Sequence, residues 1–167
     1  MEDIEVPTEH LHEEINEHAN KGNKWSMYIA ISTAFMAVLA AIAGLMAGHF
    51  SNEALIEQIK ASDQWAYYQA KGIKSDIIAG SNVKDSNKIA KYKSDQLQIE
   101  KTAKEFEKNS ATFLEKHVIL ARAVTLFQIA IAISAISILT GKRSLWYLAI
   151  LLSLTGIFFF LASFFKL

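Results

Sequence analysis

The residues best suited to chemistry in this chain are histidines and glutamates near its start. His10, Glu14 and His18 follow one another at intervals of four residues, so a helix would place all three on one face. Imidazole and carboxylate groups on helices can hold a metal ion inside a bundle. Such a site needs further ligands from a facing helix, and Glu and His on a surface helix are more often simply solvated. These three residues are therefore weak metal candidates, and we predict no metal site.

The rest of the sequence carries no comparable signal for catalysis or for a cofactor. There is no cysteine, so thiolate metal ligands and disulfides are excluded. The 17 basic and 17 acidic side chains balance, which gives no reason to expect nucleic acid as a partner. We predict a protein that is not an enzyme and binds no cofactor, and a metal-dependent enzyme that uses the N-terminal His and Glu residues is the last-ranked alternative.

Three long apolar runs dominate the sequence, at residues 25–48, 123–141 and 145–165. None of them contains a charged residue, and the only proline of the chain is Pro7. A helix rises about 1.5 Å per residue, so about 20 apolar residues suffice to cross the hydrocarbon core of a bilayer. The sequence therefore predicts an all-α membrane protein with three transmembrane helices.

Residues 49–122 keep a helical periodicity outside these runs, broken by a turn signal near residues 80–86. On both sides of the turn, residues alternate spacings of three and four, which is the pattern of a coiled-coil seam. We predict that spans 1 and 2 extend into a long antiparallel coiled-coil hairpin outside the bilayer. The predicted seam consists of Leu55, Ile59, Ala66, Gln69, Ile73, Tyr92, Gln96, Ile99, Phe106 and Phe113.

The first arm of this hairpin has a second apolar face, which one returning helix cannot cover. In the first span, small residues at four-residue spacing would also let two helices approach closely in lipid. We expect a neighbouring subunit to cover these surfaces, and the alternative is that the N-terminal helix folds over the second face. The predicted subunit interface consists of Ala40, Gly44, Gly48, Phe50, Ala54, Ala61, Trp65 and Tyr68.

Residues 1–24 form an acidic segment in which Leu11, Ile15 and Ala19 predict a short amphipathic helix. Its acidic faces favour packing on protein over binding to an anionic bilayer surface. Lys142 and Arg143 lie in the shortest loop, so the positive-inside rule places this loop and the N-terminus in the cytoplasm. The hairpin would then face outward.

Three segments of the chain resemble a known family, and they read EVPTEHL, NEALIEQIKASDQWAYYQAKGIK and LARAVTLFQIAIAISAI. The most specific piece is SDQWAYYQAKGIK, at residues 62–74. They resemble the bacterial membrane protein family catalogued as domain of unknown function 4337. The resemblance implies a bacterial inner membrane and three spans, and it carries over no catalytic or binding residue.

Two functions remain open at this point. The first is an oligomeric membrane scaffold that assembles or docks a protein partner through its hairpin or its N-terminal helix. The second is a homo-oligomeric channel or transport accessory, with a pore lined by polar and small residues of spans 1 and 2. Gln128 is the polar residue of span 2 that such a pore would use.

Overall fold

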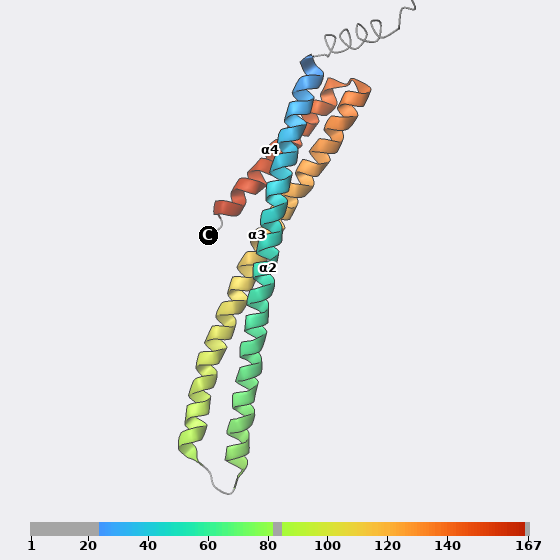
Figure 1. The fold of residues 1–167 in the computed structure, drawn as a ribbon. Coiled ribbons are helices and arrows are strands. Elements are labelled where there is room, and N and C mark those ends of the chain that lie inside the picture. Colours follow the sequence, from blue (N-terminus) through green and yellow to red (C-terminus); the bar gives the residue numbers. More distant parts are fainter. Residues whose placement is uncertain (1–23, 82–84, 166–167) are drawn as a thin grey trace, which may run out of the picture. The chain divides into compact units, whose positions relative to one another are not determined.

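The described part of the chain, residues 24–81 and 85–165 of a computed structural model, consists of three helices. They are α2 (Lys24–Gly80), α3 (Ser86–Thr140) and α4 (Arg143–Phe165), and Figure 1 shows their order along the chain. The two long helices, α2 and α3, pack against each other. The predicted all-α class with three apolar helices is therefore confirmed for the described residues. The predicted acidic helix before Lys24 lies outside them.

The ends of the helices have local causes in the sequence. Asp85 caps α3, because its Oδ1 accepts a hydrogen bond from the backbone N–H of Lys88 at 3.1 Å. This bond is the largest of the interactions that hold the pKa of Asp85 below its usual 3.8. At the other end of α3, Gly141 has a positive φ of 66°, a left-handed conformation that glycine adopts without strain. Ser137 Oγ donates to the carbonyl of Lys142 at 2.9 Å and ties this turn to α3.

The helices pass through two compact units. In the described residues, one unit comprises 24–41 and 124–157, and the other comprises 42–123 and 158–165. The first unit has a small core of Met36, Ala130 and Ala149 from its three helical segments. Phe127 is fully buried in the same unit and packs against Gly156.

All three helices contain a stretch that is long and apolar enough to cross a membrane. Only 17% to 28% of the residues in these stretches are buried within the chain. Most of their apolar side chains therefore point away from the rest of the protein. A soluble protein buries such side chains, whereas a helix in lipid exposes them.

The second unit contains an antiparallel pair of helices, formed by residues 42–80 of α2 and 86–123 of α3, which we call the α2–α3 pair (Figure 1). Three side chains of α3 reach backbone carbonyls of α2 across the contact. Ser110 Oγ donates to the carbonyl of Ala54 at 2.8 Å and Gln96 Nε2 to that of Tyr68 at 3.2 Å. The ring of His117 bonds the carbonyl of Ala47 at 2.8 Å through Nδ1, which must carry the proton because the carbonyl only accepts.

The residues of α2 that face α3 form one row, which we call the inner row. Its members alternate spacings of three and four, and all are buried or half-buried. They are Ala47, Phe50, Ala54, Glu57, Ala61, Gln64, Tyr68, Lys71 and Ser75. The facing row of α3 is also buried or half-buried, and it consists of Ile89, Tyr92, Gln96, Ile99, Ala103, Phe106, Ser110, Phe113 and His117.

The inner row differs from the seam that the sequence predicts for α2. The predicted seam residues of α2 are all exposed, and together with Ser62 they form a second row that we call the outer row. The outer row consists of Leu55, Ile59, Ser62, Ala66, Gln69 and Ile73. The seam prediction was wrong for α2 because small Ala side chains let α3 come close enough for its polar side chains to reach α2 carbonyls. Leu and Ile at these positions would hold the helices apart.

Candidate functional site

Two polar layers interrupt the contact between α2 and α3, and the first is centred on Glu57. This residue is only 8% exposed, between Ala54 and Ala61 of the inner row. Its Oε1 accepts a bond from Lys60 Nζ at 2.7 Å, and its Oε2 accepts one from Asn109 Nδ2 at 3.4 Å. The carboxylate therefore has partners on both helices, which offsets part of the cost of burying its charge.

The Glu57 layer predicts that the α2–α3 pair loses stability in acid. The hydrogen bond from Lys60 holds the pKa of Glu57 below its usual 4.5. The folded state thus binds this proton more weakly than the unfolded chain, so the stabilisation is complete above the unfolded pKa and is lost as pH falls through the folded pKa. We expect the melting temperature of the wild type to fall steeply below about pH 4.5.

The test compares thermal unfolding of the wild type and Glu57→Gln by circular dichroism, between about pH 6 and pH 3. We expect Glu57→Gln to be less stable than the wild type near neutral pH and to lose less stability in acid. Glu105→Gln is the control, because Glu105 is exposed on α3. Since Asp85 titrates in the same direction in every variant, only the difference between curves counts. Parallel curves for the wild type and Glu57→Gln would contradict the prediction.

The second polar layer is centred on Lys71, whose side chain is 15% exposed. Its Nζ lies 2.7 Å from Asp95 Oδ2 of α3. The same Nζ lies 5.2 Å and 5.1 Å from the ring centroids of Tyr67 and Tyr92, within the range of cation–π attraction. The hydrogen bond with Asp95, and next that with Tyr67, raises the pKa of Lys71 above its usual 10.5.

Gly72 belongs to the same layer, because it leaves room for a side chain of α3. A Cβ atom at this position would lie 2.9 Å from Gln96 Nε2. The amide of Gln96 therefore depends on the missing side chain to reach the carbonyl of Tyr68. This polar layer fixes how α2 and α3 are aligned, because any shift of one helix separates Lys71 from Asp95 and Gln96 from its carbonyl.

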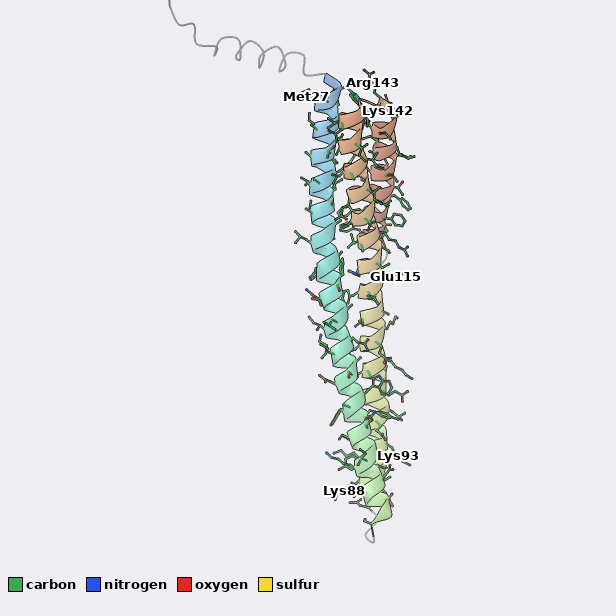
Figure 2. All side chains as sticks on the ribbon, turned by 90° about the vertical axis from the view of Figure 1, so that its right-hand side faces the viewer. Met27, Lys88, Lys93, Glu115, Lys142 and Arg143 are labelled. Atoms are coloured by element: carbon green, nitrogen blue, oxygen red, sulfur yellow. The ribbon has the colours of Figure 1, made fainter. Side chains whose placement is uncertain are left out.

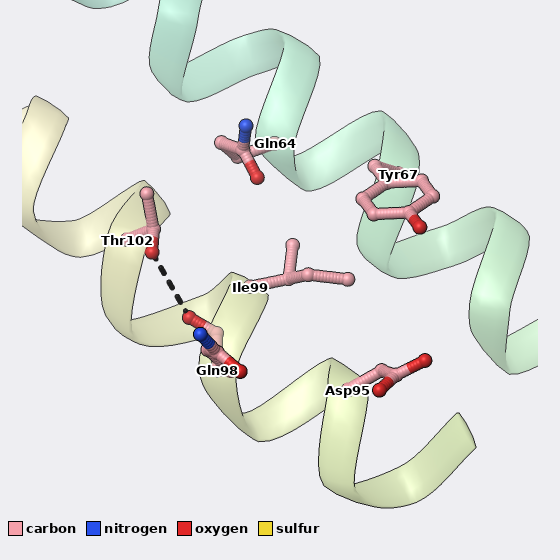
Figure 3. A pocket seen from close by; sticks show the side chains of 6 residues that line it. All are labelled: Gln64, Tyr67, Asp95, Gln98, Ile99 and Thr102. Carbon is pink, nitrogen blue, oxygen red and sulfur yellow. Dashed lines mark hydrogen bonds between the residues drawn. The ribbon is translucent and has the colours of Figure 1, made fainter. Parts of the chain in front are cut away.

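A shallow groove lies beside the second layer, open to solvent (Figure 3). It is lined by Gln64, Tyr67, Asp95, Gln98, Ile99 and Thr102. Asp95 is held by Lys71, and Thr102 Oγ1 donates to the carbonyl of Gln98 in its own helix at 3.1 Å. The groove can offer amide and phenol groups for hydrogen bonds. It contains no pair of a nucleophile and a base, so its residues do not form a catalytic arrangement.

The weak metal candidates His10, Glu14 and His18 lie outside the described residues. Within residues 24–81 and 85–165, no group of three or more His, Asp or Glu side chains is placed to hold a metal ion. Gln128 is exposed on α3.

The structure places some residues of the predicted subunit interface against α3 and leaves others uncovered. Ala54 and Ala61 are buried against α3 within one chain, and the ring of Phe50 stacks on Phe113 with centroids 6.2 Å apart. Trp65 Nε1 donates to Glu107 Oε1 of α3 at 2.8 Å. Tyr68 is half-buried, and its ring packs edge-on against Trp65 with centroids 5.5 Å apart. Ala54, Ala61 and Phe50 were therefore assigned wrongly, because α3 uses the face that was expected to be free. The assignment of Trp65 and Tyr68 to a subunit interface stays a prediction.

The small residues that the sequence predicts for the interface in the first span are not packed against α3 in the same way. Ala40 is half-buried, whereas Gly44 and Gly48 are exposed and an added Cβ would meet nothing within 4 Å at either position. No described helix approaches these two glycines closely. Their predicted role in a contact between subunits stays a prediction.

Sequence reasoning missed Glu57 and Lys71 as members of the contact. A signal for them exists, because the inner row has the same alternation of three and four as the predicted seam. Charged residues are seldom buried, so the presence of Glu57 and Lys71 argues against burial of this row. Glu57 is held by Lys60 of α2 and Asn109 of α3, and Lys71 is held by Asp95 of α3. Spacing alone does not show such partners.

Residues 24–81 and 85–165 define a class: they form three helices, each with a stretch able to cross a membrane, and the two long helices pack together through small and polar residues. A comparison with protein families finds a match over most of the chain. The family model described as "Domain of unknown function (DUF4337)" matches residues 25–166, and the chain belongs to this family. No curated protein and no solved structure matches the chain.

Proposed function

We propose that the chain is a non-enzymatic integral protein of a bacterial cytoplasmic membrane that works as an oligomeric scaffold. Residues 25–48, 123–141 and 145–165 are the spans that anchor it. The α2–α3 pair is a coiled-coil hairpin outside the bilayer, over residues 49–122, and it assembles with other copies or docks a protein partner. The observation that carries the proposal is the outer row, which is regularly spaced, is uncovered and has apolar residues at four of its six positions.

The turn between α3 and α4 supports the membrane part of the proposal. Figure 2 shows Lys142 and Arg143 at this turn. The Arg143 guanidinium lies 5.7 Å from the ring centroid of Trp25, and Trp146 Nε1 donates to Ser32 Oγ at 3.2 Å. Tryptophans beside basic residues at the ends of apolar helices are typical of a membrane–water interface. The positive-inside rule then places this turn in the cytoplasm and the hairpin outside.

The outer row supports the assembly part of the proposal. Leu55, Ile59 and Ile73 are 59%, 52% and 60% exposed, although they lie on a helix outside the predicted spans. A large apolar strip on a water-facing surface is unusual in a monomer and marks a site of protein contact. Burying it against another helix would stabilise the contact by about 25 cal/mol per Å² of apolar surface.

The test is the size of the particle in lipid nanodiscs, measured by native mass spectrometry. We expect the triple substitution of Leu55, Ile59 and Ile73 by Ser to shift the wild-type oligomer to smaller species. Because these side chains are exposed within one chain, helicity and melting of the monomer should change little. The matched control replaces Leu97 and Leu114 by Ser, which are exposed on α3. A wild type that is already monomeric in nanodiscs would overturn the proposal.

A channel or transport accessory is the second candidate, and the position of Gln128 favours it. Its amide is exposed on an apolar helix, where lipid offers no hydrogen bond, so a neighbouring copy or a water-filled path would satisfy it. Ion flux through liposomes that contain the purified protein separates the two candidates. Flux that Gln128→Leu abolishes would favour the channel, and its absence in an intact oligomer would favour the scaffold.

A further inference from the structure

The outer row has the sequence pattern of one particular kind of helix contact. In the usual heptad letters, Ile59, Ala66 and Ile73 occupy positions a, and Leu55, Ser62 and Gln69 occupy positions d. All six are exposed. Ile at a combined with Leu at d favours two parallel strands over three or four, and Ile59, Ile73 and Leu55 follow this rule. The other two d positions, Ser62 and Gln69, are polar, so the apolar part of the row is narrow and one further helix parallel to α2 would cover it.

The chain itself does not offer this helix. α3 already occupies the inner row, and it runs antiparallel to α2. The N-terminal residues 1–24 precede the first span, so in a membrane-spanning chain they lie on the other side of the bilayer from Leu55. A second copy in the same bilayer meets the requirement, because both copies leave the membrane at the same residue and their α2 helices then run in the same direction.

We propose that two copies of this protein pack their α2 helices in parallel and in register through the outer row. Each residue of the row then faces its own counterpart, as a two-fold axis perpendicular to the bilayer requires. This inference rests on the proposed membrane scaffold, and it names the partner of the outer row and the geometry of the contact.

Asn52 continues the row towards the membrane and supports the register. It occupies the next position a and is exposed. An Asn at a single position a fixes register and strand number in parallel coiled coils, because the two amides pair with each other and any shift leaves both unpaired. Between Asn52 and Ile73, this is the only Asn at such a position.

The charges beside the row are also compatible with a parallel pair. In that geometry position g of one helix faces position e of the other. Gln58 would face Asp63 of the second copy, and Trp65 would face Ala70, so no like charges meet at these positions. Lys60 and Lys74 occupy positions b, which point away from the outer row, so neither lysine meets the second copy there.

The absence of cysteine from the sequence allows a direct test by disulfide cross-linking in native membranes. Single substitutions Ile59→Cys, Ser62→Cys and Ala66→Cys each place one thiol per chain in the row, so any disulfide joins two copies. Lys74→Cys is the control, because its position b lies on the same helix but points away from the outer row. After mild oxidation we expect at least about fivefold more dimer for the three row variants than for the control, because only their Cβ atoms come within disulfide range, roughly 4 Å.

Equal cross-linking at all four positions, or none at the three row positions, would overturn the parallel contact. Native mass spectrometry of the wild type in nanodiscs then separates this failure from that of the proposed function. An oligomer without cross-links at the row would retain the scaffold and reject the parallel contact. A monomer would reject both.

Discussion

Replacing Phe127 by Ala is expected to destabilise the unit formed by residues 24–41 and 124–157 by about 3 to 5 kcal/mol. The Phe127 side chain is 0% exposed. Its ring lies so close to the backbone of α4 that a Cβ atom at Gly156 would come within 3.0 to 3.3 Å of three ring carbons. Removing the ring leaves a cavity that neither helix can fill without moving.

The measurement is reversible unfolding in detergent, followed by the fluorescence of Trp25 and Trp146, which belong to this unit. Phe35→Ala is the matched control, because Phe35 belongs to the same unit and its side chain is 60% exposed. The two variants remove the same ring, so their difference isolates the effect of burial. If both variants lost equal stability, Phe127 would not be the packing residue that the structure indicates.

Replacing Ala61 by Phe is expected to destabilise the α2–α3 pair by about 1 to 3 kcal/mol or more. Ala61 and Ala103 are both 0% exposed, on facing rows of α2 and α3. A ring at residue 61 has no space unless the helices separate. Separation would also break the hydrogen bond from Ser110 to the carbonyl of Ala54 and leave both groups unpaired.

Ala66→Phe is the control for this second variant, because Ala66 lies in the exposed outer row. In the detergent-solubilised monomer we expect it to melt like the wild type, while Ala61→Phe melts at a lower temperature by circular dichroism. The pair of variants also tests which face of α2 meets α3. If Ala66→Phe were the destabilising change, the outer row would be the true seam.

The sequence by itself determined the helices and their limits. With Pro7 as the only proline, only the turn signal near residues 80–86 and the short loop at residues 142–144 break the helical periodicity after residue 24. The structure has this turn between Gly80 and Ser86, and the second turn at Gly141 before Arg143. These features are local, because caps, glycines and charge-free runs act within a few residues of themselves.

In α3, the periodicity of the sequence is enough to predict which face is buried. The residues from Tyr92 to Phe113 that the sequence places in a seam are buried or half-buried in the structure. Outside the predicted spans, α3 has one regular row with large apolar residues, and the exposed Leu97 and Leu114 do not form a second one. A helix with a single such row leaves little choice of face.

Which face of α2 meets α3 was decided only by the tertiary structure. α2 has two rows with the same spacing, and hydrophobicity favours the outer one through Leu55, Ile59 and Ile73. The inner row wins within one chain because its alanines allow close approach, and because α3 supplies Ser110, Asn109 and Asp95 as partners for the carbonyl of Ala54, for Glu57 and for Lys71. The spacing of residues shows only that they lie on one face of a helix. Which of two such faces makes the contact depends on pairs of residues that are far apart in the sequence.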